Sequence, residues 1–189
     1  MNNLEAYKGV FVFAQQVDNV ISNIAFELIG KGKELAKDLG VEVTAVLVGS
    51  DVKGLADQLA EYGADKVIVV DDPELKEYRT EPYTHAIASV IEEFKPEIFL
   101  IGATAIGRDL GPRVCARIHT GLTADCTKLD IDEETKLLKL QEQYRSGKIR
   151  EEELSKEQVD MLCALYDKQI SQLRKSNAIL KNNLIKKTC

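Results

Sequence analysis

The residues with the clearest chemical potential lie in one stretch, residues 100–126, which reads LIGATAIGRDLGPRVCARIHTGLTADC. An apolar run ends there in a loop of small residues, and Gly102, Gly107 and Gly111 would let the backbone approach a neighbouring group closely. A helix that begins after such a loop directs backbone N–H groups at an anion, and Arg108 could add a bidentate, charge-assisted contact. The pattern is compatible with a phosphate site or with a tight turn between a strand and a helix.

The spacing of the glycines does not decide between these two interpretations. It is neither GxGxxG after the first strand nor GxxxxGK[ST], so neither of the common phosphate-binding motifs is present. A tight turn that carries Arg108 and Asp109 as a surface or interface pair remains open beside the nucleotide interpretation. If a nucleotide binds at the strand ends, the contacts that we expect are Gln15, Gly102, Thr104, Gly107 and Arg108.

No other set of residues predicts catalysis or metal binding. Cys115 and His119 lie one helical turn apart, but no third group is available to orient them, and Cys115 shares an apolar helix face with Val114 and Ile118. A packed structural cysteine is the interpretation that this position favours, and His85 is expected on a helix surface. The chain has four cysteines without CxxC spacing and two histidines, so we predict reduced thiols, no metal site and no enzymatic activity.

The elements that would position these residues alternate regularly up to about residue 130. Short apolar runs rich in β-branched residues predict strands at 9–14, 41–49, 66–71 and 97–103. Apolar residues at helical spacing predict helices at 19–40, 52–64, 82–94 and 108–120, the first of them ending at Gly40 as a C-cap. Residues 121–132 predict a fifth strand or a strand with an irregular start. This alternation indicates an α/β fold, with a parallel sheet covered by helices on both faces.

The pattern changes after about residue 130. Ser155 followed by Gln158 has the spacing of a capping box, and an apolar stripe after it predicts one long amphipathic helix at about 156–184. Such a stripe must cover the sheet domain, pair with another helix or dimerise, so self-association through this helix is one expectation. We therefore divide the chain into a domain at 1–140 and a linker with a helical segment at 141–189.

Composition restricts the class of protein and its partners. The chain of 189 residues is 44% hydrophobic and 30% charged, as expected for a soluble globular protein, and its net charge is −6. The acidic excess lies before residue 141 and argues against nucleic acid as the main partner. No apolar run approaches the length of a membrane span, and the first residues lack the features of a signal peptide. We expect a cytoplasmic protein.

Several segments together resemble a known family. They are YKGVFVFAQQ, ELIGKGKELAKDLG, VKGLADQLAEYGADKVIVVDDP and KPEIFLIGATAIGRDLGPRVCARIHTGLTADCTKLDID. From about Tyr7 to Leu140 the chain resembles the N-terminal domain of the electron transfer flavoprotein alpha subunit, and LIGATAIGRDLGPR and TGLTADC are the most specific parts.

The resemblance implies a three-layer, adenine-nucleotide-hydrolase-like (Rossmann-like) domain. In the family this domain packs against a similarly folded beta subunit in a heterodimer that passes electrons between dehydrogenases and their acceptors. The electron-carrying FAD lies mainly on a second alpha-subunit domain. By this resemblance the chain would support electron transfer by scaffolding the beta subunit, and it would hold no flavin by itself. In the related beta subunit and in universal stress proteins, the matching loop contacts an adenine nucleotide, so a small nucleotide-binding regulatory protein is the alternative.

The chain departs from the family pattern after KLLKL, residues 136–140. The family continues there with the last strands of the domain and then the FAD-binding domain, whereas this chain continues with QEQYRSGKIREEELSKEQVDMLCALYDKQ, which suggests a fusion. The flavin-site residues of the family have no counterpart here. Without the last strands one edge of the sheet would be open to association, and the predicted tail helix is a candidate to cover it.

Overall fold

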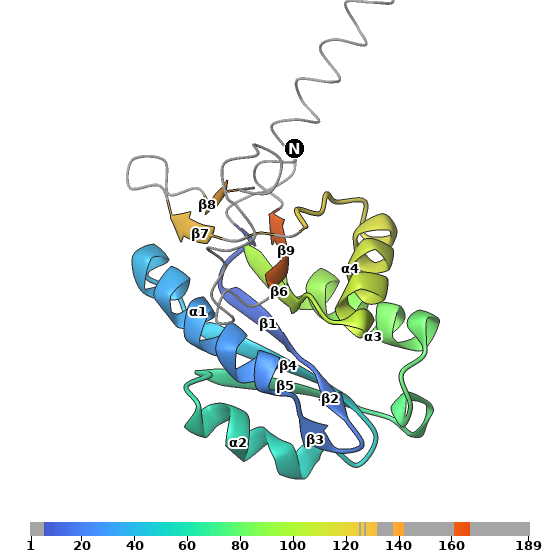
Figure 1. The fold of residues 1–189 in the computed structure, drawn as a ribbon. Helices are drawn as coiled ribbons and strands as arrows, with labels where there is room; N and C mark the ends of the chain where they lie inside the picture. Colours follow the sequence, from blue (N-terminus) through green and yellow to red (C-terminus); the bar gives the residue numbers. More distant parts are fainter. Residues whose placement is uncertain (1–5, 125, 127, 132–137, 142–160, 167–189) are drawn as a thin grey trace, which may run out of the picture.

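A five-stranded sheet forms the centre of the protein, in the strand order β5-β4-β1-β6-β9 (Figure 1). The structure is a computed structural model that describes residues 6–124, 126, 128–131, 138–141 and 161–166. The strands of this sheet are β1 (Val10–Ala14), β4 (Val43–Gly49), β5 (Lys66–Asp71), β6 (Ile98–Gly102) and β9 (Met161–Tyr166). The first four run parallel to one another and β9 runs antiparallel to β6.

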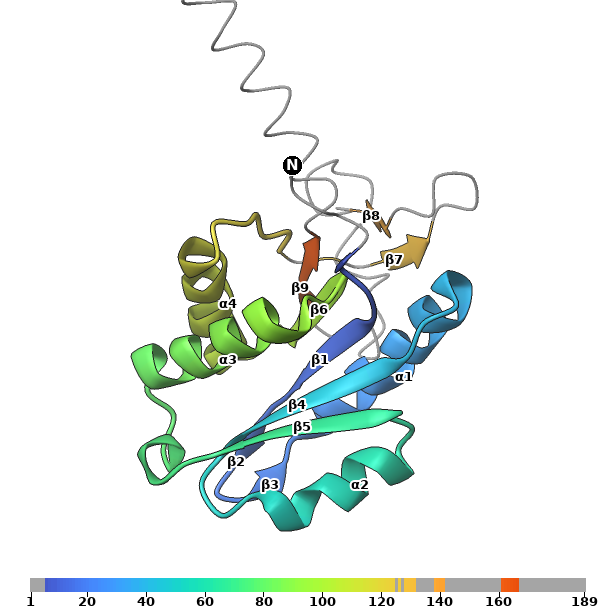
Figure 2. The same cartoon turned by 180° about the vertical axis from the view of Figure 1, so that it is seen from behind.

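Helices cover both faces of the sheet, as Figures 1 and 2 show from opposite sides. The helices are α1 (Asn23–Leu39), α2 (Ala56–Glu61), α3 (Thr80–Phe94) and α4 (Ala105–Arg117), with short 3-10 turns η2 (Lys53–Leu55) and η3 (Pro73–Leu75). Residues of α1 and α2 pack with Val10 and Val12 in one apolar cluster, whereas residues of α3 and α4 pack with Phe11 and Phe13 in another. The alternation of the two clusters along β1 confirms the predicted parallel sheet between two helical layers.

The four helices predicted before residue 121 are present, and the ends of two of them are defined by clear caps. Helix α1 ends at Gly40, whose φ of 69° is left-handed and whose N–H bonds to the carbonyls of Ala36 and Lys37, as expected for a C-cap. Helix α4 begins at Ala105, three residues before the predicted start, because the Thr104 hydroxyl accepts a hydrogen bond from the Gly107 N–H and caps the helix there.

A small hairpin between β1 and α1 was not predicted. It consists of β2 (Gln16–Val17) and β3 (Val20–Ile21), which are antiparallel. The two turn residues, Asp18 and Asn19, have φ values of 51° and 60°. Asp and Asn tolerate these angles better than other non-glycine residues, and a two-residue turn of this kind matches the twist of the flanking strands. The hairpin occupies the first three residues of the expected helix 19–40.

The segment predicted as a fifth strand contains β7 (Lys128–Ile131), but β7 does not join the main sheet. It pairs antiparallel with β8 (Leu138–Gln141) in a separate two-stranded sheet. Leu129 and Ile131 are buried in the same apolar cluster as α1, so this strand lies against the α1 side of the domain. Its alternation of buried and less buried residues, rather than a continuous apolar run, suits a strand with one face on a helix.

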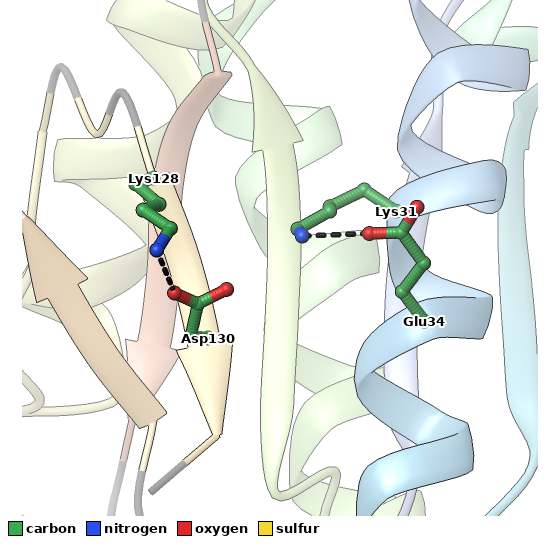
Figure 3. A network of polar contacts seen from close by, with 4 residues as sticks. All are labelled: Lys31, Glu34, Lys128 and Asp130. Carbon is green, nitrogen blue, oxygen red and sulfur yellow. Dashed lines mark hydrogen bonds and ion pairs between the residues drawn. The ribbon is translucent and has the colours of Figure 1, made fainter.

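Two ion pairs lie on these neighbouring elements, as Figure 3 shows. Lys31 and Glu34 form one pair along α1, and Lys128 and Asp130 form the other along β7, each with a nitrogen–oxygen distance of 2.7 Å. All but Lys31 are more than one third exposed. Each pair lies within one element, so neither joins β7 to α1, and the contact between these elements comes from the burial of Leu129 and Ile131 in the apolar cluster of α1.

The predicted tail helix is wrong over residues 161–166, where the structure has β9. The register pairs Ile98 with Tyr166 and Gly102 with Met161. Strand β6 would otherwise carry an unpaired row of backbone N–H and C=O groups, and the apolar run MLCALY can satisfy them as a strand. The edge that we expected a helix to cover is thus covered by a strand. The rest of the predicted helix, with the capping box at Ser155, lies outside the described residues.

The division of the chain at residue 140 stays a prediction, although β9 brings part of the predicted tail segment into the main sheet. Of the helices that the structure describes, none has both the length and the apolar character that a membrane crossing requires.

Candidate functional site at the carboxyl ends of the strands

The predicted site residues lie where the chain leaves β1 and β6. These strands are neighbours in the sheet, but the helices that follow them, α1 and α4, cover opposite faces. In open parallel sheets, ligands bind at such a switch point, beyond the carboxyl ends of the strands. Gln15 follows β1 and Thr104 lies two residues beyond β6, and the two side chains meet: the Thr104 hydroxyl donates to Gln15 Oε1 at 2.5 Å.

The Thr104 hydroxyl is used in both of its hydrogen-bonding roles. It donates to Gln15, which is 8% exposed, and it accepts from the Gly107 N–H at 3.0 Å. The second bond occupies one of the N–H groups in the first turn of α4 that an anion would otherwise bind. The protein's own side chain therefore takes the place of a ligand at this N–H group.

The glycines of the loop allow close packing of the chain on itself. A Cβ atom on Gly107 would lie 1.9 Å from the carbonyl oxygen of Gly102, and a Cβ atom on Gly102 would lie 2.5 Å from Ile24 Cγ1. Real side chains do not fit at such distances. Gly107 thus lets the first turn of α4 rest on the end of β6, and Gly102 lets β6 lie against α1, which favours the tight-turn interpretation of this loop.

Four of the five predicted nucleotide contacts form one contiguous group. Gln15 and Thr104 share a hydrogen bond, Thr104 caps Gly107, and Gly107 adjoins Gly102. Arg108 is exposed on the first turn of α4, and its N–H donates to the Thr104 carbonyl at 2.9 Å. That these residues contact a nucleotide remains a prediction.

A buried polar cluster next to this group was not predicted. Gln16 Nε2 donates to the Val48 carbonyl at 3.2 Å and to the Tyr83 hydroxyl at 3.4 Å, while that hydroxyl donates to the Leu75 carbonyl at 3.0 Å. Burial raises the pKa of Tyr83, so its hydroxyl stays protonated and can donate. The cluster connects the hairpin after β1, the end of β4 and η3. The sequence gives no signal for it, because its members come from separate elements.

A second unpredicted cluster joins the start of α3 to α4. The Asp109 carboxylate accepts hydrogen bonds from the Thr80 and Tyr78 hydroxyls, both at 2.6 Å. The bond from Thr80, and then that from Tyr78, lower the pKa of Asp109, and the charge of Arg113 acts in the same direction. Burial, followed by the bond to Asp109, raises the pKa of Tyr78. At neutral pH the cluster therefore holds a carboxylate and a neutral phenol.

The structure favours the structural interpretation of Cys115. The residue is 4% exposed in the apolar cluster of α3 and α4, and burial raises the pKa of its thiol to about 12. A thiol of this kind is protonated at neutral pH and is a poor nucleophile. His119 is exposed, and so is His85, as predicted for a helix-surface residue. Within the described part of the chain, no three His, Cys, Asp or Glu residues gather as a metal would require.

Comparison with known proteins identifies the family. The chain matches the electron transfer flavoprotein domain over residues 10–167. It is 52% identical over 134 residues to the electron transfer flavoprotein subunit alpha of Clostridium acetobutylicum, covering 71% of this chain and 40% of that protein. It is 48% identical over 136 residues to the same subunit of Megasphaera elsdenii, covering 72% of this chain and 40% of the relative.

A third relative has a different name. The acryloyl-CoA reductase electron transfer subunit beta of Anaerotignum propionicum is 51% identical over 130 residues, which cover 69% of this chain and 35% of that protein. The aligned part of the chain therefore spans about 35–40% of the length of these three curated relatives. Since the match covers most of the chain and includes the sheet from β1 to β9, the chain belongs to the electron transfer flavoprotein domain family.

Proposed function

We propose that this chain is an electron transfer flavoprotein alpha-type component that acts by binding and scaffolding a beta subunit. In this role it is not an enzyme, and it works in the cytoplasm. The observation that carries the proposal is sequence identity: about half of the aligned residues are identical to those of alpha subunits, over about 70% of the chain. The matched family domain, residues 10–167, includes the helices α1 to α4 of both layers and the strands between them.

We further propose that the chain alone holds no FAD. The relatives are flavoproteins by name, but the chain spans 40% of their length. At the switch point, the groups best placed to bind a ligand are already bonded within the protein. The Thr104 hydroxyl donates a hydrogen bond to Gln15 and accepts one from the Gly107 N–H. These bonds support a scaffolding role for the loop over a ligand-binding role.

Co-purification tests the partner. The full chain with an affinity tag is expressed together with an electron transfer flavoprotein beta subunit, and the two are expected to elute together in a fixed ratio after washing in high salt. A tagged protein with the same fold class but from another family serves as the control. Elution of the chain without the beta subunit would contradict the proposal.

The alternative function, a nucleotide-binding regulatory protein, has one structural observation in its favour. Gln15, Gly102, Thr104 and Gly107 form one group at the topological switch point, where nucleotides bind in many open sheets. Titration calorimetry with AMP, ATP and NADH separates the alternatives. Scaffolding predicts no heat of binding, whereas saturable heat that Thr104→Val abolishes would support the nucleotide site.

A further inference from the structure

The outer edge of β5 is one of the two edges of the main sheet that the described residues leave unpaired, the other being the outer edge of β9. Strand β9 covers β6 at one side of the sheet, whereas β5 at the other side pairs only with β4 among the described residues. Figure 2 shows β5 along the rim of the sheet, beyond β4. Val67, Ile68, Val69 and Val70 are all partly exposed, whereas the equivalent residues of β4 are buried. Such an edge presents a row of backbone donors and acceptors.

The pairing with β4 determines which residues of β5 point outward. Glu42 accepts from Val10, so the even-numbered residues of β4 face β1 and the odd-numbered ones face β5. The register places Thr44 beside Lys66, and the Asp72 N–H donates to the Gly49 carbonyl at 3.0 Å. The even-numbered residues of β5 therefore bond to β4. The outward N–H and C=O groups belong to Val67, Val69 and Asp71.

This edge lacks the features that usually protect edge strands from association. Residues 67–70 contain no charge and no proline, and the register with β4 continues without a bulge from Lys66 to Asp71. Natural edge strands commonly carry a lysine, a proline or a bulge in this central part. An unprotected strand of this kind is suited to pair with another strand.

We propose that two copies of this chain join their sheets through β5, antiparallel and about a two-fold axis at Val69. In this register Val69 lies opposite the second copy's Val69, Val67 lies opposite Asp71, and Ile68 lies opposite Val70. The outward-facing residues are then the ones that exchange backbone hydrogen bonds. Lys66 lies opposite the second copy's Asp72, and the symmetry repeats this pair of opposite charges on the other side.

Other registers lack this charge complementarity. An axis at Ile68 places Asp65 opposite the second copy's Asp71, which brings two carboxylates together. An axis at Val67 places Lys66 opposite Ile68 and leaves the charges unmatched. The sequence KVIVVDD, residues 66–72, thus favours one antiparallel register with itself.

Both charged groups are accessible for this contact. Lys66 is 64% exposed, and its ion pair with Glu42 on the same molecule is exposed as well. The ammonium has three donors, so it can serve a second carboxylate without loss of the first. Asp72 is exposed and accepts from the Glu74 N–H at 2.8 Å, which leaves acceptor capacity on its carboxylate.

Sedimentation equilibrium of the full chain in reducing buffer, with two charge-reversal variants, tests the proposal. The unsubstituted chain is expected to form a dimer of the 21.0 kDa chain. K66E and D72K each set like charges opposite each other twice, and each is expected to weaken the dimer about tenfold or more. An equimolar mixture of the two variants restores opposite charges at both positions, so it is expected to form heterodimers. K31E, which reverses a lysine on α1, is the matched control and should leave the dimer unchanged.

A backbone variant separates the edge contact from other modes of association. V69P removes an outward N–H that makes no bond to β4, so the sheet should be retained, as checked by circular dichroism, while the dimer is lost. A monomer at every concentration of the unsubstituted chain would overturn the proposal. So would a dimer that persists in V69P and fails to respond to charge reversal, which would place the contact on another surface or on a different partner strand.

Discussion

At the residue scale, the close approach of Gly107 to the end of β6 leads to a prediction about stability. Gly107→Ala places a methyl group where the Gly102 carbonyl oxygen lies 1.9 Å away, and backbone must move to accommodate it. We expect the free energy of unfolding to fall by about 3 kcal/mol or more. Urea unfolding followed by circular dichroism measures the change.

Gly30→Ala is the matched control for this substitution. Gly30 is exposed on α1, and a Cβ atom there meets nothing within 4 Å. Alanine is the better helix former, so the free energy of unfolding should rise by up to about 1 kcal/mol. If both variants unfold at the same urea concentration, Gly107 is not required for the close packing of α4 on β6.

Asp109 gives a prediction about pH at the same scale. The Thr80 and Tyr78 hydroxyls stabilise the carboxylate, so its folded-state pKa lies below that of the unfolded chain. The stabilisation is present above the unfolded pKa and is lost as pH falls through the lowered folded one. An NMR titration of the carboxyl carbon should therefore give a pKa below the ordinary aspartate range. Thr80→Val should raise that pKa more than Tyr78→Phe, and a pKa at the ordinary value before substitution would contradict the account.

At the scale of elements, β9 is expected to stabilise the sheet by pairing with β6. Deletion of residues 141–189 removes β9 and leaves the N–H and C=O groups along that side of β6 unpaired. We expect a lower midpoint of thermal unfolding, faster amide exchange in residues 98–102 and more light scattering. Deletion of residues 167–189 alone retains β9 and serves as the control. Equal exchange rates in the two truncated chains would show that β9 does not protect β6.

The elements that could be predicted from the sequence are those that one local feature marks clearly, such as an apolar run or a glycine at the end of a helix. The strands β1, β4 and β6 are largely apolar runs, because both of their faces are covered, and Gly40 marks the end of α1 with a left-handed residue. The β2–β3 hairpin was missed although its Asp18-Asn19 turn is a recognisable signal. The helical periodicity around 161–166 led to a wrong prediction, since pairing with β6 depends on a strand far away in the sequence.

The candidate site shows the same division between local and long-range information. The strand-end position of Gln15 and Thr104 could be predicted, because parallel strands place their carboxyl ends at one edge. Their mutual hydrogen bond could not, since it joins residues 89 positions apart. The Tyr78–Asp109 contact likewise depends on how α3 packs against α4, over 31 positions. Residue types near strand ends thus indicate where a site lies but not whether its groups are already bonded to one another.

At the scale of the whole molecule, the chain combines a sheet between two helical layers with a small share of its relatives' length. The match to electron transfer flavoprotein alpha subunits covers 71% of this chain but 40% of the relative from Clostridium acetobutylicum. We therefore propose that this chain provides a surface for a partner, and that the flavin of the family belongs to parts that the matched region does not include. A scaffold of this kind differs from a carrier of electrons because it holds no redox group.

The visible absorbance spectrum of the purified full chain, recorded before and after incubation with FAD and removal of free FAD by desalting, is the decisive experiment for this proposal. We expect a colourless protein with no flavin bands, both as purified and after incubation. A retained flavin spectrum in stoichiometric amount would contradict it, because the chain would then hold the redox group without a second domain.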